Sequence, residues 1–353
     1  MGAPFLRDLW YFASPGEALK RGGLTRVILL GEPVLLGREA DGTAFALKDI
    51  CPHRGVPLSA GRLVAPSGSC HHSAVECPYH GWKFATDGRC TEIPSLTADQ
   101  QMEVERIRVR AYPVAELQGN IWVYMASDET ATAEPIVEPP RIPGFETATP
   151  GLRETMDFNC HVDHAVVGLM DPAHGPFVHR SWYWRNQASI HEKAKDFAPS
   201  HLGFTMVAHT PSRNSFAYKI LGGQPRTEIS FQLPGIRIEN ITAGRHHVVG
   251  LTCVTPIDET RTRITQSFYW TMPLLSLMRP VLRPFVRAFL KQDGDMVNLQ
   301  QEGLRFNPRL MLINDADVQA KWYQRLKGAW IDARANSQPF ENPVKPVTLK
   351  WRS

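Results

Sequence analysis

Cysteine and histidine occur as two short pairs in the first quarter of the sequence. The first pair is Cys51 and His53, in the segment CPHRG, and the second is Cys77 and His80, in CPYHGW. Because each pair lies within a short, proline-bearing loop, its thiolate and its imidazole can converge on one metal site. Four such ligands could hold zinc tetrahedrally. They could equally hold a [2Fe–2S] cluster, with two thiolates on one iron and two imidazoles on the other, which raises the reduction potential.

The residues around the two pairs distinguish these alternatives. After the second pair come three further characteristic positions: Phe84, Asp87-Gly88 and Ile93-Pro94. Both loops together, in this order, resemble the paired loops of the Rieske family. The resemblance implies that the two cysteines and two histidines bind a Rieske [2Fe–2S] cluster, and it leaves a structural zinc ion as the lesser alternative.

The stretch between the two loops departs from the family pattern. His53 and Cys77 are separated by 23 residues (54–76), which is longer than the family's usual gap. The extra length contains Cys70, His71 and His72, which could compete as ligands. These three lack the proline-flanked context of the other pairs, so we interpret them as an insertion of unknown purpose.

A second group of ligand-type residues lies in the segment Gly168–His179. Asp171 and His174 are three apart, so one turn of helix would place them on one face. His179 would lie about 140° from His174 on a regular helix, but Gly175-Pro176 can break the helix and bring the second imidazole back. Two histidines and a carboxylate suit a non-haem Fe(II) site with open positions for O₂. Alternatively, Asp171 is only a helix N-cap followed by proline, and both histidines are ordinary polar groups.

After a Rieske-like domain, this D-x-x-H-x-x-x-x-H segment is similar to that of the Rieske oxygenase α subunit, and the resemblance covers essentially the whole chain. It implies that His174 and His179 are iron ligands. It also implies that Asp171 is the bridging carboxylate that links the iron site to a Rieske histidine, His80, of a neighbouring subunit.

The third iron ligand is implied by a later segment, Gln292–Gln300. It resembles the acidic helix of the family, with Asn298 in place of glutamate, and this points to Asp293. Asp295 is the competing position, and a solvated acidic turn is the alternative that needs no metal. Gly168, where the family often has asparagine, is a second departure from the pattern, so no side-chain role is assigned there.

Among the histidines outside these patterns, four occur as two close pairs. His161 and His164 come upstream of the expected helix, and we interpret them as strand-end residues. The pair His246-His247 is expected to be solvated on a strand.

The elements that must position these residues divide the chain into a β-rich domain (1–130), a polar, proline-rich linker (131–150) and a second domain (151–353). The second domain combines strand-like segments with helical regions near 165–180 and from 274 to about 305, which predicts an α+β domain with helices packed on an antiparallel sheet. The family resemblance implies an all-β Rieske domain followed by a helix-grip-like catalytic domain. The expected strands are Thr25–Leu30, Pro33–Arg38, Ala44–Lys48, Glu103–Val109, Asn120–Tyr124, Phe204–His209, Ser215–Ile220, Glu228–Phe231, Arg237–Ile241, His247–Cys253 and Thr262–Trp270.

Composition and charge exclude other classes of protein. The 353 residues are 43% hydrophobic and 21% charged, and the net charge of +4 is too small to suggest a nucleic-acid partner. The first residues lack the basic and apolar regions of a signal peptide, and six scattered cysteines are too few for a disulfide scaffold, so we expect a cytoplasmic protein. The most apolar stretch, Thr271–Leu290, holds three prolines and three arginines, which argues against a membrane span. Its central part, Pro273–Phe289, is expected to line a pocket or to join the core.

The resemblance also implies a function. The chain ends 60 residues after Asp293 and is similar to the compact α-only group that includes vanillate and dicamba demethylases, which implies a head-to-tail homotrimer. Electrons from NAD(P)H would come through a separate ferredoxin or flavin reductase, because the sequence has no G-x-G-x-x-G fingerprint. The expected reaction uses O₂ to hydroxylate or demethylate an apolar, aromatic or cyclic substrate. Ring cis-dihydroxylation is the alternative, and a non-catalytic Rieske electron carrier is the alternative from another class.

Overall fold

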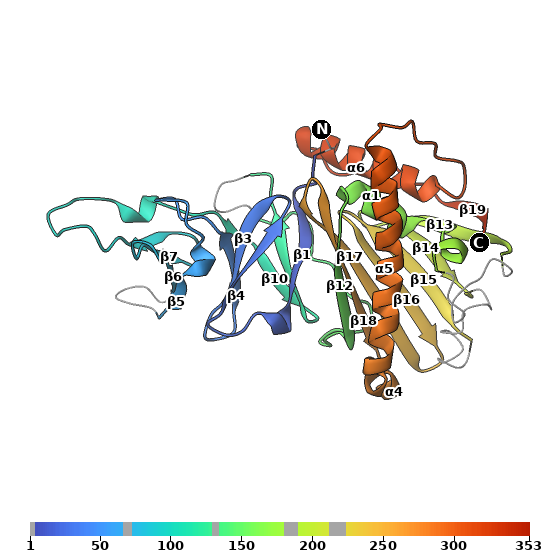
Figure 1. The fold of residues 1–353 in the computed structure, drawn as a ribbon, viewed down its shortest axis with the longest axis horizontal. Helices are drawn as coiled ribbons and strands as arrows, with labels where there is room; N and C mark the ends of the chain where they lie inside the picture. The colour runs from blue at the N-terminus through green and yellow to red at the C-terminus, as the bar shows by residue number, and fades with distance from the viewer. Residues whose placement is uncertain (1–3, 66–72, 129–133, 180–189, 212–223) are drawn as a thin grey trace. The chain divides into compact units, whose positions relative to one another are not determined.

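The computed structural model describes residues 4–65, 73–128, 134–179, 190–211 and 224–353 (Figure 1). It forms two compact units, one from Arg7 to Arg141 and one from Ile142 to Ser353 that also includes the first residues up to Leu6. The change from one unit to the other falls inside the segment 131–150, and the domain limits at 130 and 151 stay a prediction. Cys70–His72 and the expected strand Ser215–Ile220 lie outside the described residues.

The N-terminal unit consists of short antiparallel strands. They are β1 (Leu9–Pro15), β2 (Leu24–Leu29), β3 (Glu32–Arg38), β4 (Ala44–Lys48), β5 (Arg62–Val64), β6 (Ala74–Glu76), β7 (Lys83–Ala85), β8 (Cys90–Glu92), β9 (Ala111–Tyr112), β10 (Val114–Leu117) and β11 (Asn120–Met125), with 3-10 turns η1 (Gly16–Ala18), η2 (Leu58–Ala60) and η3 (Val104–Arg106). Among the described residues the strands form three sheets, ordered β1-β11-β10, β2-β3-β4-β9 and β5-β6-β7-β8. The predicted β-rich N-terminal domain is therefore confirmed.

One expected strand of this unit, Glu103–Val109, was wrong. Its Val and Ile residues suggested a strand, but residues 104–106 form the turn η3, in which the N–H of Ile107 donates to the carbonyl of Val104 at 3.0 Å. No residue of this turn is buried. Alternation over a few residues predicts a strand only where a neighbouring element covers one face.

The C-terminal unit is built on one large antiparallel sheet. Its strands are β12 (Leu152–Phe158), β13 (Glu192–Ser200), β14 (Gly203–His209), β15 (Arg226–Gln232), β16 (Ile236–Ala243), β17 (His246–Asp258), β18 (Arg261–Trp270) and β19 (Val347–Arg352), and its helices are α1 (Val162–Met170), α2 (Gly175–Val178), α4 (Pro273–Leu277), α5 (Arg279–Leu304) and α6 (Val318–Ala335). In the described part of the chain, eight strands follow the order β12-β18-β17-β16-β15-β14-β13-β19. Figure 1 shows α5 running across this sheet. The predicted α+β domain with an antiparallel sheet and covering helices is confirmed.

The helical region expected near 165–180 consists of two short helices with a break between them. α1 ends at Met170, and the single turn α2 begins at Gly175. The interpretation of His161 and His164 as strand-end residues was wrong, because His161 is the N-cap of α1 and His164 lies within its first turn. The imidazole of His161 accepts a hydrogen bond from the backbone N–H of Asp163 at 3.2 Å, which satisfies a donor at the helix start.

Helix α6 fixes the position of α1. The ammonium group of Lys327, whose side chain is 5% exposed, donates to the carboxylate of Asp163 on α1 at 2.8 Å, and the hydroxyl of Tyr323 donates to the same group at 2.6 Å. Trp322 packs its ring 5.0 Å from Phe204 on β14, so α6 is itself anchored on the sheet. This chain of contacts holds the N-terminal end of α1, the helix that leads to the segment with Asp171.

In the N-terminal unit, the half-buried carboxylate of Glu32 connects separate segments of the chain. Glu32 on β3 accepts hydrogen bonds from Arg7 and, at 2.9 Å, from the Tyr112 hydroxyl, while Arg110 lies 3.6 Å away. Burial raises the pKa of Glu32, but the hydrogen bonds from Arg7 and Tyr112 and the charges of both arginines outweigh it, so the pKa lies below its ordinary value. Ionised Glu32 therefore stabilises this unit.

We expect E32Q to lower the free energy of unfolding by about 1–3 kcal/mol at neutral pH, because two hydrogen-bond donors lose a charged acceptor and Arg110 loses an ion-pair partner. A depressed folded-state pKa contributes stability above the unfolded pKa, and this contribution is lost as the pH falls through the folded pKa. The difference between wild type and variant should therefore shrink below about pH 4, as measured by urea unfolding. E105Q, at an exposed glutamate, is the matched control and should change little. A difference for E32Q that does not vary with pH would contradict the prediction.

Candidate metal centres

The two cysteine–histidine loops fold into the same backbone turn. The N–H of Gly55 donates to the carbonyl of Cys51 at 2.8 Å, and the N–H of Gly81 donates to the carbonyl of Cys77 at 3.1 Å. Each cysteine N–H donates in turn to the carbonyl five residues further on, at 2.9 and 2.8 Å. Both glycines have a positive φ, +71° and +69°, which a side chain would strain. This repeated turn is the reason for glycine at the end of each loop.

The side chains of the two loops separate into buried thiols and more accessible imidazoles. Cys51 and Cys77 are 2% and 3% exposed, inside the core of the β5–β8 region, whereas His53 is half-buried and His80 is exposed. The two imidazole rings lie 4.5 Å apart, and His53 stacks on Trp82 at 4.7 Å. Sulfur ligands therefore face inward and nitrogen ligands face outward.

This arrangement fits a two-iron cluster better than a single zinc ion. Four ligands on one zinc would have their donor atoms about 3.3–3.8 Å apart. Among the described residues, the one group of three or more potential ligands with donor atoms within 4.8 Å of one another lies elsewhere, on the C-terminal unit. Donors that are grouped in pairs but spread over a larger distance match two irons, one for the thiolates and one for the imidazoles.

A bound metal would change the protonation of the Cys51 thiol. Burial raises the pKa of this thiol, and the adjacent thiol of Cys77 raises it further, against hydrogen bonds from the backbone N–H groups of His53 and Arg54 that lower it. Two neighbouring thiolates would repel each other without a cation. The same backbone N–H groups would also stabilise negative charge on the sulfur of a bound cluster.

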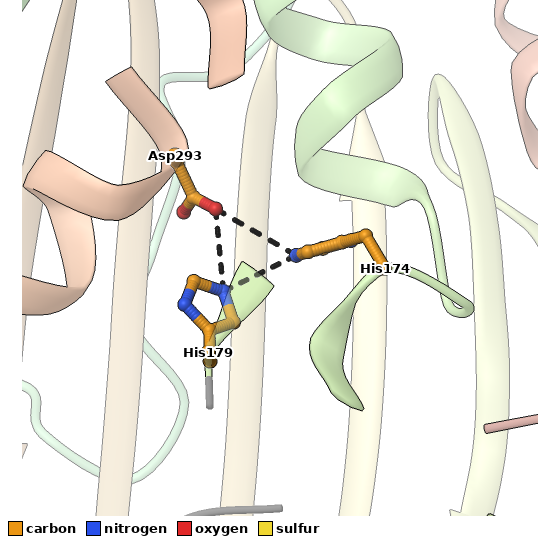
Figure 2. Close-up of side chains that lie close together, drawn as sticks. All are labelled: His174, His179 and Asp293. Atoms are coloured by element: carbon orange, nitrogen blue, oxygen red, sulfur yellow. Dashed lines mark hydrogen bonds and ion pairs between the residues drawn. The ribbon is translucent and has the colours of Figure 1, made fainter. Parts of the chain in front are cut away.

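The second centre brings together three side chains from two parts of the chain, as Figure 2 shows. The Nε2 atoms of His174 and His179 lie 3.2 Å apart, and Oδ1 of Asp293 lies 3.7 Å from the first and 3.2 Å from the second. Three ligands at about 2.1 Å from one metal, on one face of its coordination shell, would be separated by about 3.0–3.4 Å. The residues therefore fit a mononuclear metal ion with an open side.

Local structure explains why the two histidines meet. His174 is the N-cap and His179 the C-cap of α2, so the pair flanks a single helical turn that starts at Gly175-Pro176. The expectation that Asp171 and His174 share one helical turn was wrong, because Asp171 is the extended C-cap residue of α1. The alternative of Asp171 as a helix N-cap is wrong for the same reason.

Close packing of α5 fixes the third side chain. Gly294, next to Asp293, is buried, and a Cβ atom there would lie 3.1 Å from the ring of Phe158 on β12. The absence of that atom lets the helix approach the strand closely. Asp295 points elsewhere and forms an ion pair with Lys291 at 2.6 Å, with half of its side chain exposed. Of the two candidate aspartates, Asp293 is thus the one that joins the histidines.

The hydrogen bonds of the two imidazoles set their tautomers. Nδ1 of His174 lies 2.9 Å from the backbone carbonyl of Asp171, and Nδ1 of His179 lies 2.9 Å from Oε1 of Gln292. Both partners are acceptors, so each Nδ1 carries the proton and each Nε2 presents a lone pair. Two nitrogen lone pairs and a carboxylate oxygen face one another at 3.2–3.7 Å, an arrangement that a cation stabilises.

Asp171 interacts with His174 through its side chain as well. Its Oδ2 lies 3.7 Å from Nδ1 of His174, and its Oδ1 accepts a hydrogen bond from the N–H of Ala173 at 2.7 Å. Burial raises the pKa of Asp171, but the hydrogen bonds from His174 and Ala173 outweigh burial and leave the pKa below its usual range. Burial lowers the pKa of His174, yet its hydrogen bond to Asp171 and the charges of Asp171 and Asp293 raise it above its ordinary value.

Sequence reasoning missed Gln292, although it directly precedes Asp293, because a glutamine on a helix carries no signal of a contact with a distant histidine.

The expectation for His247 as a solvated residue was also wrong. Its Nε2 lies 2.5 Å from Oδ1 of Asn240, and its ring stacks on Phe145 at 4.9 Å.

Two family models match the chain. The model described as Rieske [2Fe-2S] domain matches residues 9–113, and the model described as Vanillate O-demethylase oxygenase C-terminal domain matches residues 158–333. Each candidate metal centre lies within one of the two matched regions.

The relatives agree with both models. Chlorophyllide a oxygenase of Chlamydomonas reinhardtii is 30% identical over 83% of this chain and 42% of its own length. The oxygenase component of dicamba O-demethylase from Stenotrophomonas maltophilia is 35% identical over 50% of this chain and 48% of its own, and 4beta-methylsterol monooxygenase of Methylococcus capsulatus is 28% identical over 85% and 82%. The chain thus spans less than half of the first two of these relatives.

The fold is that of a solved structure as well. The crystal structure of dicamba monooxygenase bound to dicamba matches with a TM-score of 0.74 and 24% identity, over 95% of this chain and all of that one. With a Rieske domain, an oxygenase C-terminal domain and this fold, the chain belongs to the Rieske non-haem iron oxygenase family.

Proposed function

We propose that this chain is the terminal oxygenase of a Rieske system, which uses O₂ and electrons from NAD(P)H to hydroxylate or oxidatively demethylate an apolar, aromatic or cyclic substrate. The observation that carries the proposal is the convergence of His174, His179 and Asp293 in a chain that also has a Rieske domain. In this proposal these three residues hold Fe(II), and Cys51, His53, Cys77 and His80 hold the [2Fe–2S] cluster.

The bound cofactors would supply a site for O₂ and the electrons that its reduction needs. The protein's part is to hold the ligands and to control access. His179 is 1% exposed and stacks against Phe289 at 3.6 Å, so it forms the closed side of the site. The side chains of His174 and Asp293 are 26% and 29% exposed, which makes theirs the side from which substrate and O₂ approach.

Asp171 is proposed as the bridge for electrons between subunits of a homotrimer. Its depressed pKa keeps the carboxylate charged, and its side chain, 34% exposed beside His174, can accept a hydrogen bond from His80 of a neighbouring copy. Electrons would reach the cluster from a separate ferredoxin or flavin reductase.

Two alternative functions differ in how well the observations support them. Ring cis-dihydroxylation stays a second candidate because 3-chlorobenzoate-3,4-dioxygenase oxygenase subunit of Comamonas testosteroni is 31% identical over 49% of this chain and 38% of its own length. A non-catalytic Rieske electron carrier needs no ligand set in its second domain, so the convergent triad disfavours it.

No helix in the described part of the chain is long and apolar enough to cross a membrane. The cysteines that the structure describes are free thiols. Free, buried thiols support the proposal of a cytoplasmic protein, since that compartment keeps thiols reduced.

Metal analysis tests the proposal. Anaerobically purified protein should hold three irons per chain and be coloured, whereas an electron carrier would hold two and a zinc-bound module would be colourless. We expect D293A to keep the two cluster irons and the visible spectrum but to lose the third iron. D295A is the matched control and should keep all three. Loss of the third iron in D295A but not in D293A would overturn the assignment of Asp293.

D171N should leave both metals bound but lower substrate-dependent O₂ consumption by a factor of about 100 or more. The reason is that a neutral amide accepts a hydrogen bond from an imidazole N–H less strongly than a carboxylate does. The measurement is NADH-dependent O₂ uptake with a reductase present, together with iron content. Unchanged turnover at full iron loading would remove the bridging role.

Q292L should weaken binding of Fe(II) by about 10- to 100-fold, because Nδ1–H of His179 loses its acceptor and the imidazole is no longer held in the metal-binding tautomer. Q292E keeps an acceptor oxygen at the same place and should restore binding. The dissociation constant of Fe(II) from the second centre, titrated anaerobically, checks both variants. Equal affinities for Q292L and wild type would show that Gln292 does not position His179.

A further inference from the structure

The pairing register of the large sheet shows which side chains lie on the face where α5 and α6 pack, which we call the helix-side face. Glu154 on β12 pairs with Arg283 of α5, and the ring of Phe231 on β15 lies 6.0 Å from that of Tyr323 on α6. Residues directly opposite each other on neighbouring strands point to the same side of a sheet. One such row crosses five adjacent strands: Glu154, Gln266, Thr252, Arg237 and Phe231. Arg237 on β16 therefore lies on the helix-side face.

Arg237 forms an ion pair with Glu239 on this face. Glu239 is two residues further along β16 and so points to the same side, and its Oε2 lies 3.1 Å from Nη2 of Arg237. Both side chains are 24% exposed, so the pair lies neither at the open surface nor inside the core. Because desolvation offsets much of the attraction between charges that are partly removed from water, such a pair adds little stability. Its place on the helix-side face indicates a role in binding.

His209 on β14 adds a third polar group to the helix-side face. It is opposite Thr227 on β15, one row beyond Ile229, which is opposite Glu239. Its Nδ1 lies 2.9 Å from the backbone carbonyl of Val207, so Nδ1 carries the proton and Nε2 presents a lone pair. Burial lowers the pKa of His209, although its hydrogen bond to Val207 and the charge of Glu239 act in the opposite direction, so the ring is neutral at neutral pH. A neutral ring leaves the charge balance of the ion pair unchanged.

Helix α1 brings the proposed iron ligands close to this ion pair. A Cβ atom at Gly235, two residues before Arg237, would lie 3.1 Å from a methyl group of Val166, so α1 contacts the chain at the start of β16. From that contact Arg237 lies about 7 Å along the strand. Asp171, the C-cap of α1, lies about 8 Å along the helix from the same contact, and His174 follows it closely. A two-ring compound held beside His174 can therefore reach the ion pair with its far end.

We propose that the ion pair of Arg237 and Glu239 selects ring substrates that carry a hydroxyl group away from the reacting position. This inference rests on the proposed oxygenase function. A hydroxyl group can donate to the carboxylate of Glu239 and accept from the guanidinium group of Arg237 at the same time. A carboxylate on the substrate would be repelled by Glu239, and an ammonium group by Arg237, whereas the pair as a whole carries no net charge. A purely apolar ring would displace water from both charged groups without replacing its hydrogen bonds.

Isothermal titration calorimetry tests the proposal on the purified full chain with its metals bound, under anaerobic conditions and without turnover. The probes are 2-naphthol, 2-naphthoate and naphthalene, which share one ring system and differ in the polar group. At neutral pH we expect the wild-type chain to bind 2-naphthol about tenfold more tightly than either of the others, or better. The reason is that a site built to hydrogen-bond a hydroxyl group rejects the analogue that lacks it, and that like charges repel.

The variant E239Q should change the preference from the hydroxyl group to the carboxylate. It keeps the length of the side chain but leaves Arg237 as an uncompensated cation, so 2-naphthoate should gain about tenfold in affinity and bind more tightly than 2-naphthol. An ion pair that only stabilised the sheet would lower the free energy of unfolding in E239Q without creating affinity for an anion. The matched control is D157N, which removes the ion pair of Asp157 with Arg263 at 2.7 Å on the opposite face of the same sheet. This control should keep the wild-type preference.

Two results would overturn the proposal. The first is a wild-type chain that does not prefer 2-naphthol, whether it binds another probe better or binds none. The second is an E239Q variant that gains no affinity for 2-naphthoate, or a D157N variant that gains as much. Iron content, measured on the same samples, separates this inference from the proposed function. A chain with three irons and no such preference refutes only the role of the ion pair, whereas a chain without the third iron refutes the oxygenase proposal itself.

Discussion

Two imidazole nitrogens and a carboxylate oxygen that face one another at 3.2–3.7 Å repel unless a cation lies between them. The C-terminal unit holds this unfavourable arrangement by contacts on every side. The carbonyl of Asp171 and the amide of Gln292 fix the tautomers, and the close approach of α5 at Gly294 fixes the carboxylate. Tertiary packing thus maintains a ligand geometry that the three side chains would not adopt alone.

The N-terminal unit positions its cluster ligands with a repeated backbone turn. The same glycine-dependent turn occurs twice, after β4 and after β6, and each copy directs a thiol into the core and an imidazole outward. Sulfur inside and nitrogen outside is the order that a cluster needs if its histidine-bound iron is to exchange electrons at the surface. A chain with both an electron-donating centre and a centre for O₂ supports the oxygenase proposal better than a chain with only one of these centres would.

The two halves of helix α5 differ in their surroundings. The second half of α5 has buried residues that pack on the sheet and holds Asp293, whereas most residues of the first half are exposed. The difference arises because glycine and small buried residues occur only in the second half, where they allow close packing on β12.

The sequence by itself determined the two-domain α+β architecture, nine of the nineteen described strands and the candidate ligands, because short loops with glycine and proline and the spacing of histidines constrain local geometry strongly. Only the tertiary structure decided that Asp171 caps α1 and that Gln292 contacts His179. It alone revealed α6 and the strands β1, β5 to β10, β12, β13 and β19. Strands such as β13, with charged residues along much of their length, show no periodic signal. Their stability depends on neighbours distant in sequence, and distance along the chain hides such contacts from any local pattern.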